Sequence, residues 1–242
     1  MKKILVTGGF GKIGKHFVQQ YAHKYEITVA DVFTNAETFT DSVRIEKADL
    51  TDASACAKLC EGMDTVIHLA GLVDLSEEYE VLNTNIKITQ HVFKAAVQAG
   101  CRRLIFASSA QTIESYPTDI QIRSNMLVKP KNLYGVSKCF GEALAAYYAY
   151  HHGISAICLR IGAYEFPADF TEMNARDLSA YLHPDDCNQL LESCIETDNI
   201  QYEVLNAISD NRYKRLDITE AIEKVGYQPK ADGFSLFALK PE

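Results

Sequence analysis

Short runs rich in valine and isoleucine alternate with longer amphipathic segments, and this alternation constrains the fold more than any other feature of the chain. The strand-like runs are "KKILVTGG", "EITVADV", "VRIEKADL", "MDTVIHLAG" and "CRRLIFASS". Helix-like segments stand between them at residues 11–24, 52–62 and 83–100. Such alternation is typical of a parallel sheet with helices on both faces. We therefore expect an α/β fold built on a doubly wound parallel sheet.

The periodicity stops after residue 109 and then resumes. Residues 110–131 are polar and mixed, as in a loop that lines a site. A helix is predicted over 134–151 and a strand at "ISAICLRIG"; these are followed by a loop, a helix after "HPDD", a short strand "IQYEVLNAI" and a last helix "ITEAIEKVG". The predicted organisation is one large domain over residues 1–162 and a small substrate lobe over 163–242, partly packed on the first.

Three glycines are placed to hold a phosphate group. Gly8, Gly11 and Gly14, in "VTGGFGKIG", lie between the first predicted strand and the first predicted helix. Glycine permits a tight turn there and lets backbone N–H groups approach a pyrophosphate, which then rests against the positive end of the helix. The turn predicts a dinucleotide site at this junction.

Two aspartates end the next two strands. Asp31, in "ITVADV", can accept hydrogen bonds from both ribose hydroxyls of an adenosine and would repel a 2'-phosphate. No arginine stands beside it, because "VFTN" follows, so NAD is favoured over NADP. Asp49, in "KADLTD", could meet the adenine edge or could cap the following helix together with Asp52.

Tyr134 and Lys138 lie four positions apart in "YGVSK", at the start of the predicted helix 134–151. Residues at this spacing share one helix face. An ammonium a few ångströms from a phenol lowers the tyrosine pKa from ~10 towards the range of a general base. The same spacing is common on solvated helix faces, so the pair by itself leaves both interpretations open.

The charge balance and the cysteines restrict the partners and the setting. The 24 lysines and arginines face 32 aspartates and glutamates, a net charge of -8, which disfavours nucleic-acid and membrane partners. The apolar patch at the N-terminus is too short for a signal peptide, and no stretch approaches the ~20 apolar residues of a membrane span. Seven scattered cysteines without a C-x-x-C pair indicate reduced cytosolic thiols that fill core space, with a metal site as a distant alternative.

Several short motifs occur in the order found in the short-chain dehydrogenase/reductase superfamily: "TGGFGKIG", "ADL", "HLAG", "FASS" and "YGVSK". The chain resembles the extended branch, the NAD-dependent epimerase/dehydratase family. The resemblance implies a Rossmann-type fold that binds NAD through residues 1–162. It also implies a catalytic triad in which Ser109 orients the substrate, Tyr134 transfers the proton, and Lys138 holds the nicotinamide ribose and lowers the pKa of Tyr134.

The same resemblance implies which residues hold NAD, most of them at strand ends. They are Gly8, Gly11, Lys12, Ile13, Gly14, Asp31, Asp49, Leu50, Leu69, Ala70, Gly71, Asn85, Tyr134, Lys138 and Ile161. Related proteins often pair through the helices that correspond to 83–100 and 134–151, which makes a homodimer a further expectation.

Within this branch, residues 134–162 and the short tail are most similar to the uronate dehydrogenases, which oxidise the anomeric carbon of a hexuronic acid. Arg176, in "NARDLSAYLHPDD", falls where those enzymes carry a substrate arginine, and a guanidinium there could bind a sugar carboxylate through two hydrogen bonds. The chain departs from their polar contacts at Val73, Ala110, Gln111 and Ala163. The expected substrate residues are these four with Ser109, Tyr134 and Arg176.

The sequence thus predicts an NAD-dependent oxidoreductase that acts on a small sugar or sugar acid, with Tyr134 as general base and no metal. One alternative is a nucleotide-sugar epimerase or dehydratase with tightly bound NAD. Against it, 104 residues follow Lys138, little material for a lobe that wraps a nucleotide diphosphate. A second alternative is a protein that senses NAD without chemistry; such proteins usually lose the tyrosine or the lysine, which this chain keeps.

Overall fold

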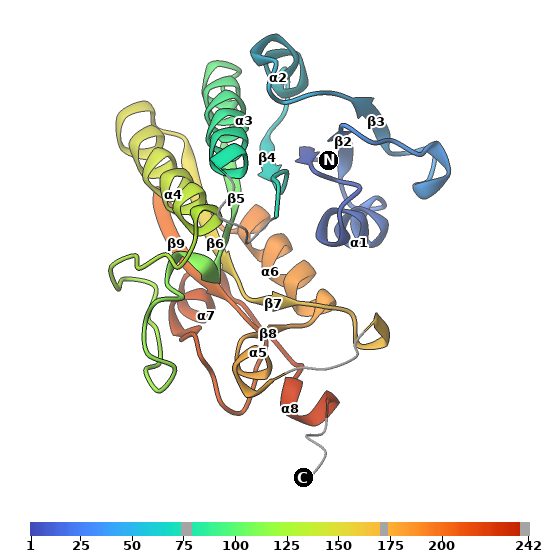
Figure 1. Cartoon of the computed structure of the whole chain (residues 1–242). Coiled ribbons are helices and arrows are strands. Elements are labelled where there is room, and N and C mark those ends of the chain that lie inside the picture. Colours follow the sequence, from blue (N-terminus) through green and yellow to red (C-terminus); the bar gives the residue numbers. More distant parts are fainter. Residues whose placement is uncertain (74–78, 170–173, 238–242) are drawn as a thin grey trace.

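A parallel sheet forms the centre of the computed structural model, which describes residues 1–73, 79–169 and 174–237 (Figure 1). The strands, in their order across the sheet, are β3 (Arg44–Lys47), β2 (Glu26–Asp31), β1 (Lys3–Thr7), β4 (Thr65–His68), β5 (Arg103–Ser109), β6 (Ser155–Ile161) and β9 (Tyr202–Ala207). Every neighbouring pair is parallel. The predicted doubly wound sheet is confirmed, and its order changes direction at β1, where ligands bind in sheets of this kind.

Helices cover both faces of the sheet. One face packs against α2 (Ala53–Cys60), α3 (Tyr79–Gln98) and α4 (Leu133–His152), and the other against α1 (Lys12–Tyr21), α6 (Pro184–Glu196) and α7 (Thr219–Val225). Strand β1 shows why both faces need a cover: successive side chains of a strand point to opposite faces, and those of β1 are apolar on both. Ile4 and Val6 belong to the core that contains Phe17 of α1, whereas Leu5 belongs to the core that contains Phe93 of α3.

Local signals set several helix ends as the sequence predicts. Pro184 occupies the first turn of α6, and the backbone N–H of Asp185 donates to the side chain of His183 at the N-cap. Gly100, just past the end of α3, has a φ of +73°, a left-handed conformation that favours glycine. The helix α3 begins at Tyr79, four residues before the predicted start at 83. Asp52 caps α2 by accepting from the N–H of Ser54 at 2.8 Å.

The chain beyond residue 162 contributes to the main sheet as well as to smaller structure. Strand β9 pairs with β6, and α6 supplies part of the core shared with α1. The short elements are β7 (Ala163–Tyr164), α5 (Ala175–Ser179), β8 (Tyr181–Leu182) and α8 (Gly233–Leu236), which the sequence does not predict because such short elements have no measurable periodicity. The division into two domains at residue 162 stays a prediction.

Candidate active site

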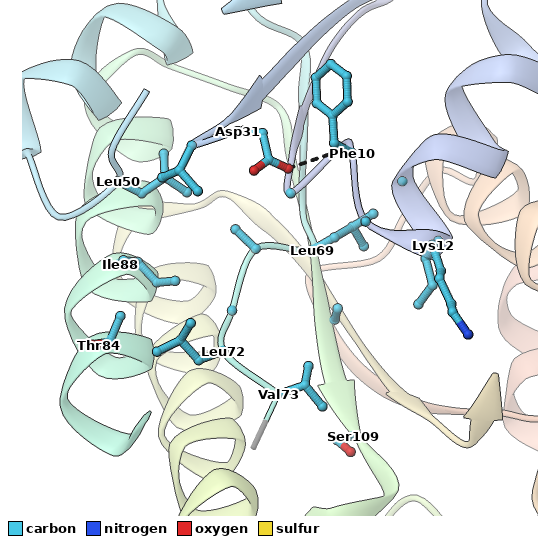
Figure 2. A pocket seen from close by; sticks show the side chains of 18 of the residues that line it. Phe10, Lys12, Asp31, Leu50, Leu69, Leu72, Val73, Thr84, Ile88 and Ser109 are labelled. Atoms are coloured by element: carbon cyan, nitrogen blue, oxygen red, sulfur yellow. Dashed lines mark hydrogen bonds between the residues drawn. The ribbon is translucent and has the colours of Figure 1, made fainter. Parts of the chain in front are cut away.

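A pocket of about 820 Å³ opens at the carboxyl ends of the central strands, where the order of the sheet changes direction. Its walls come from the turn after β1, the ends of β2 and β3, the loop after β4, the end of β5, and the first turns of α4. Figure 2 shows Leu50 and Ile88 on one side of the pocket and Lys12, at the start of α1, on the other. Segments far apart in the sequence therefore form one cavity because parallel strands end at one edge.

The glycine turn is built so that only hydrogen fits at two of its positions. A Cβ on Gly8, which has a φ of +69°, would lie 2.7 Å from the backbone nitrogen of Ala70. A Cβ on Gly14 would lie 2.6 Å from the Cα of Gly9. Gly11 is the N-cap of α1 and has no side chain that could accept a hydrogen bond from the first N–H groups of the helix, and Lys12, Ile13 and Gly14 of this first turn line the pocket. These features suit an anion at the helix N-terminus.

Asp31 lies at the far end of the same pocket. Its Oδ2 accepts from the backbone N–H of Phe10 at 3.1 Å, drawn as the dashed line in Figure 2, and its Oδ1 accepts from that of Phe33 at 3.3 Å. Two backbone donors thus fix the carboxylate, and each oxygen keeps lone-pair capacity for a ligand hydroxyl. Asp49 lines the pocket beside it and accepts from the N–H of Thr51 at 2.8 Å.

Ser109, Tyr134 and Lys138 meet in this pocket, although they come from two different elements. Ser109 ends β5 and accepts from the N–H of Gln111 at 3.2 Å. Tyr134 lies in the first turn of α4, which Asn132 caps by accepting from the N–H of Gly135 at 2.8 Å. Lys138 follows one turn later, with its Nζ 5.4 Å from the centroid of the Tyr134 ring. The arrangement unites a hydroxyl, a phenol and an ammonium.

Burial governs the acid–base properties of this group. It raises the pKa of Tyr134, and the hydrogen bond with Ser109 lowers that pKa only in part. Burial therefore opposes the expected lowering of the Tyr134 pKa by Lys138, and that lowering stays a prediction. Burial also lowers the pKa of Lys138 to about 8, since the ammonium is almost completely shielded from water. A charged Lys138 would still stabilise a phenolate, because an opposite charge nearby favours the ionised form.

A buried ion pair between Glu142 and Arg160 lies next to the triad along helix α4. Glu142, one turn after Lys138 on α4, accepts from Nε of Arg160 at 2.9 Å and from its Nη2 at 2.8 Å. The hydroxyl of Ser108 donates to the same carboxylate at 2.6 Å, and Nη1 of Arg160 donates to the carbonyl of Ser124 at 3.1 Å. Ser108 is thus committed to the network, which is consistent with the choice of Ser109 for the triad.

The Glu142–Arg160 network is not among the predictions made above, although the sequence contains a signal for it. Glu142 and Arg160 are charged residues in otherwise apolar segments, "CFGEALAA" and "AICLRIG". Buried charges of this kind are almost always paired. The structure also adds pocket residues that the sequence analysis did not single out, most of them neighbours of the predicted residues: Phe10, Val32, Phe33, Ala48, Thr51, Leu72, Thr84, Ile88 and Tyr164.

The residues predicted to hold NAD share the pocket with one exception, and their contacts with the cofactor stay predictions. All of them line the pocket except Asn85, which is 2% exposed and binds the loop after β4 instead. Its Oδ1 accepts from the N–H of Leu72 at 2.8 Å, and its Nδ2 donates to the carbonyl of Leu72 at 3.0 Å. Asn85 therefore positions the loop that carries Leu69 to Gly71. Its contact with the cofactor stays a prediction.

The predicted substrate residues are more scattered. Val73 and Gln111 line the pocket, and Figure 2 shows Val73 above Ser109. Ala110, Ala163 and Arg176 are not among the described residues that line it. Ala110 is buried, Ala163 pairs with Tyr181 through β7 and β8, and Arg176 is held by an acidic side chain. Their contact with a substrate stays a prediction.

The residues that the structure describes contain neither of two other kinds of site, a metal centre or a membrane-spanning helix. No group of three or more histidine, cysteine, aspartate or glutamate side chains there could hold a metal ion. Among the described helices, none is long and apolar enough to cross a membrane.

Comparison with known proteins identifies the family of the chain. The model of the NAD dependent epimerase/dehydratase family matches residues 4–183. The chain is 33% identical to the NAD-dependent glucose-6-phosphate dehydrogenase of Haloferax volcanii, over 99% of this chain and 97% of that protein. It is 34% identical to the uronate dehydrogenase of Pseudomonas putida, over 94% of this chain and 84% of that protein.

A solved structure extends the comparison to three dimensions. A mutant of the uronate dehydrogenase from Agrobacterium tumefaciens, complexed with NAD, superimposes with a TM-score of 0.88 at 30% identity. The match covers 97% of this chain and 87% of that one. The likeness therefore includes both the strands that end at the pocket and the chain beyond residue 162.

Proposed function

The chain belongs to the NAD-dependent epimerase/dehydratase family, and on this premise we propose that it oxidises a hydroxyl-bearing carbon of a sugar or sugar acid, with Tyr134 as general base. It is an NAD-dependent enzyme that acts on CH–OH groups. The observation that most supports the finer statement is that Ser109, Tyr134 and Lys138 line the pocket that also contains the glycine turn and Asp31.

The residues present fit the cofactor. The turn at Gly8 and Gly14 leaves no space for side chains, so a diphosphate can approach the backbone and the uncapped start of α1. Asp31 would hold the adenosine ribose, and Leu69, Ala70 and Ile161 would form the apolar wall around the nicotinamide. NAD, when bound, accepts the hydride.

The protein's own side chains would handle the proton. The hydroxyl of Ser109, beside the phenol, would hold the substrate hydroxyl in place. The phenolate oxygen of Tyr134 would then take the proton from that hydroxyl. Lys138, with its Nζ 5.4 Å from the ring centroid, would stabilise the phenolate as long as the ammonium is charged. Asn132 and the Glu142–Arg160 pair keep helix α4 fixed beneath these groups.

The function is tested by a screen for NADH production. The purified protein is given NAD with each of a panel of aldoses, uronates, sugar phosphates and nucleotide sugars, and the absorbance of NADH is followed. We expect net NADH with a simple sugar or a sugar acid. Turnover of a nucleotide sugar without net NADH would instead indicate an epimerase or dehydratase, and no turnover of any of the sugars would contradict the proposal.

Replacing Asp31 with asparagine should lower kcat/KM for NAD by about tenfold or more, because a hydrogen bond to a charged acceptor contributes roughly 1.5–3 kcal/mol. The preference for NAD over NADP should fall, since the repulsion of a 2'-phosphate is removed. Steady-state rates with both dinucleotides measure the change. The control is Asp41→Asn, which removes an exposed carboxylate outside the pocket. An unchanged NAD/NADP ratio in Asp31→Asn would contradict the assignment.

A further inference from the structure

Arg176, the residue expected to bind a substrate carboxylate, is already paired with carboxylates of the protein. Its Nε donates to Oε1 of Glu114 at 2.9 Å, and its Nη2 donates to Oε2 of the same side chain, so that the two residues form a bidentate ion pair. Its third nitrogen, Nη1, donates to Asp177 at 2.9 Å. The side chain of Glu114 is 12% exposed. Bidentate pairs between arginine and carboxylate are strong and geometrically specific.

The Glu114–Arg176 pair lies beside the pocket, at the end that contains Ser109 and Tyr134. Glu114 follows the short 3-10 turn Ala110–Thr112, which carries the pocket residue Gln111. Arg176 belongs to α5, and the residue that ends α5, Ala180, contacts the pocket residue Gly162 closely enough that a Cβ on Gly162 would collide with its carbonyl. The pair therefore connects two segments that border the proposed sugar site.

Among the described residues at this end of the pocket, every cation already has another role, so none is left for an anionic sugar. Among the described residues that line the pocket, the only cationic ones are Lys12 and Lys138. Lys12 donates to Glu165 at 2.7 Å beside the glycine turn, and Lys138 is assigned to the tyrosine and the nicotinamide ribose. Arg215, which is near Glu114, is buried and donates to backbone carbonyls of residues 116–120.

We propose that Glu114 is a built-in carboxylate that occupies Arg176, and that the pocket therefore selects neutral aldoses over uronates and sugar phosphates. The inference rests on the proposed function and narrows its substrate class. A uronate could reach Arg176 only by breaking two charge-assisted hydrogen bonds and by placing its carboxylate next to that of Glu114. Because like charges repel, this placement disfavours the binding of a uronate. A neutral sugar avoids this repulsion.

The test compares matched pairs of substrates. For the wild-type protein, kcat/KM is measured with galactose and galacturonate, with glucose and glucuronate, and with glucose 6-phosphate. We expect the neutral sugar of each pair to exceed its acid by about tenfold or more. In Glu114→Gln, whose amide cannot neutralise Arg176, the ratio of galacturonate to galactose activity should rise by about tenfold or more. A ratio of two activities does not change when a variant is merely less stable.

A control variant and the remaining outcomes make the result decisive. Glu203→Gln removes a carboxylate paired with Lys224 at 3.0 Å, away from the pocket, and should leave the ratio unchanged. Wild-type preference for uronates or glucose 6-phosphate would overturn the inference and leave the proposed function standing, as would an unchanged ratio in Glu114→Gln. No NADH from any of the sugars would overturn the proposed function itself. If Glu114→Gln does not fold, the wild-type comparison decides.

Discussion

Replacing Tyr134 with phenylalanine is expected to lower kcat by about a hundredfold or more, because removal of a positioned general base typically costs 10²–10⁴ in rate. The phenol is 8% exposed, lies against Ser109 and shares the pocket with Lys138, so water has little access to replace it as the base. The ring itself is kept in Tyr134→Phe, and helix α4 should pack as before. The affinity for NAD should change little, since most of the proposed cofactor contacts lie on other elements.

The measurements are steady-state kcat and the dissociation constant of NAD by titration. The matched control is Tyr150→Phe, which removes a phenol from the same helix at a side chain that is 60% exposed and outside the pocket lining. This control should keep full activity. A Tyr134→Phe protein with wild-type turnover would show that another group takes the proton.

Replacing Arg160 with leucine should lower the free energy of unfolding by about 3–5 kcal/mol, the usual effect of breaking a buried ion pair by removing one partner. Arg160 is 3% exposed and Glu142 is 5% exposed, so the remaining carboxylate would be left in the core with the hydroxyl of Ser108 as its one donor among the described side chains. The carbonyl of Ser124 would lose its hydrogen bond as well. Urea unfolding followed by circular dichroism measures the change.

Two comparisons separate this effect from a general loss of charge. Lys224→Leu breaks an ion pair whose lysine is 50% exposed, and it should lower the free energy of unfolding far less than Arg160→Leu does, because water screens exposed pairs. The double variant Arg160→Leu with Glu142→Leu should recover part of the lost stability, because an apolar pair of similar size removes the unpaired charge. Equal stability of Arg160→Leu and wild type would mean that Glu142 does not depend on the guanidinium.

The sequence predicts well those parts of the molecule whose conformation depends on residues close together in the chain. The strand runs and the glycine spacing at Gly8, Gly11 and Gly14 depend on a few neighbouring residues, and the structure places them as expected. Asp31 and Asp49 follow the same logic, because a residue that ends a parallel strand reaches the edge where ligands bind. Once the order of the strands is known, these side chains can be predicted to lie in one pocket.

The remainder depends on contacts between distant segments, which no local pattern encodes. Glu114 and Arg176 are 62 positions apart, and Glu142 and Arg160 are 18 positions apart on different elements. The resemblance places Arg176 where a substrate carboxylate would bind, but it does not predict that Glu114 forms an ion pair with Arg176. The raised pKa of Tyr134 had the same origin, since the depth of burial is a property of the folded chain.

Lys138 gives the active site a thermodynamic consequence for the whole protein. Its side chain is 4% exposed, and no carboxylate in the described parts of the chain forms an ion pair with it. Because burial lowers its pKa from 10.5 to about 8, the unfolded chain holds this proton more tightly, and stability is lost as the pH falls from about 10.5 through 8. At neutral pH the fold therefore carries an unfavourable charge that its chemistry needs, a conflict between stability and activity. Any ligand that binds the folded state alone offsets that cost by mass action, so bound cofactor should raise the stability of the fold as well as permit turnover.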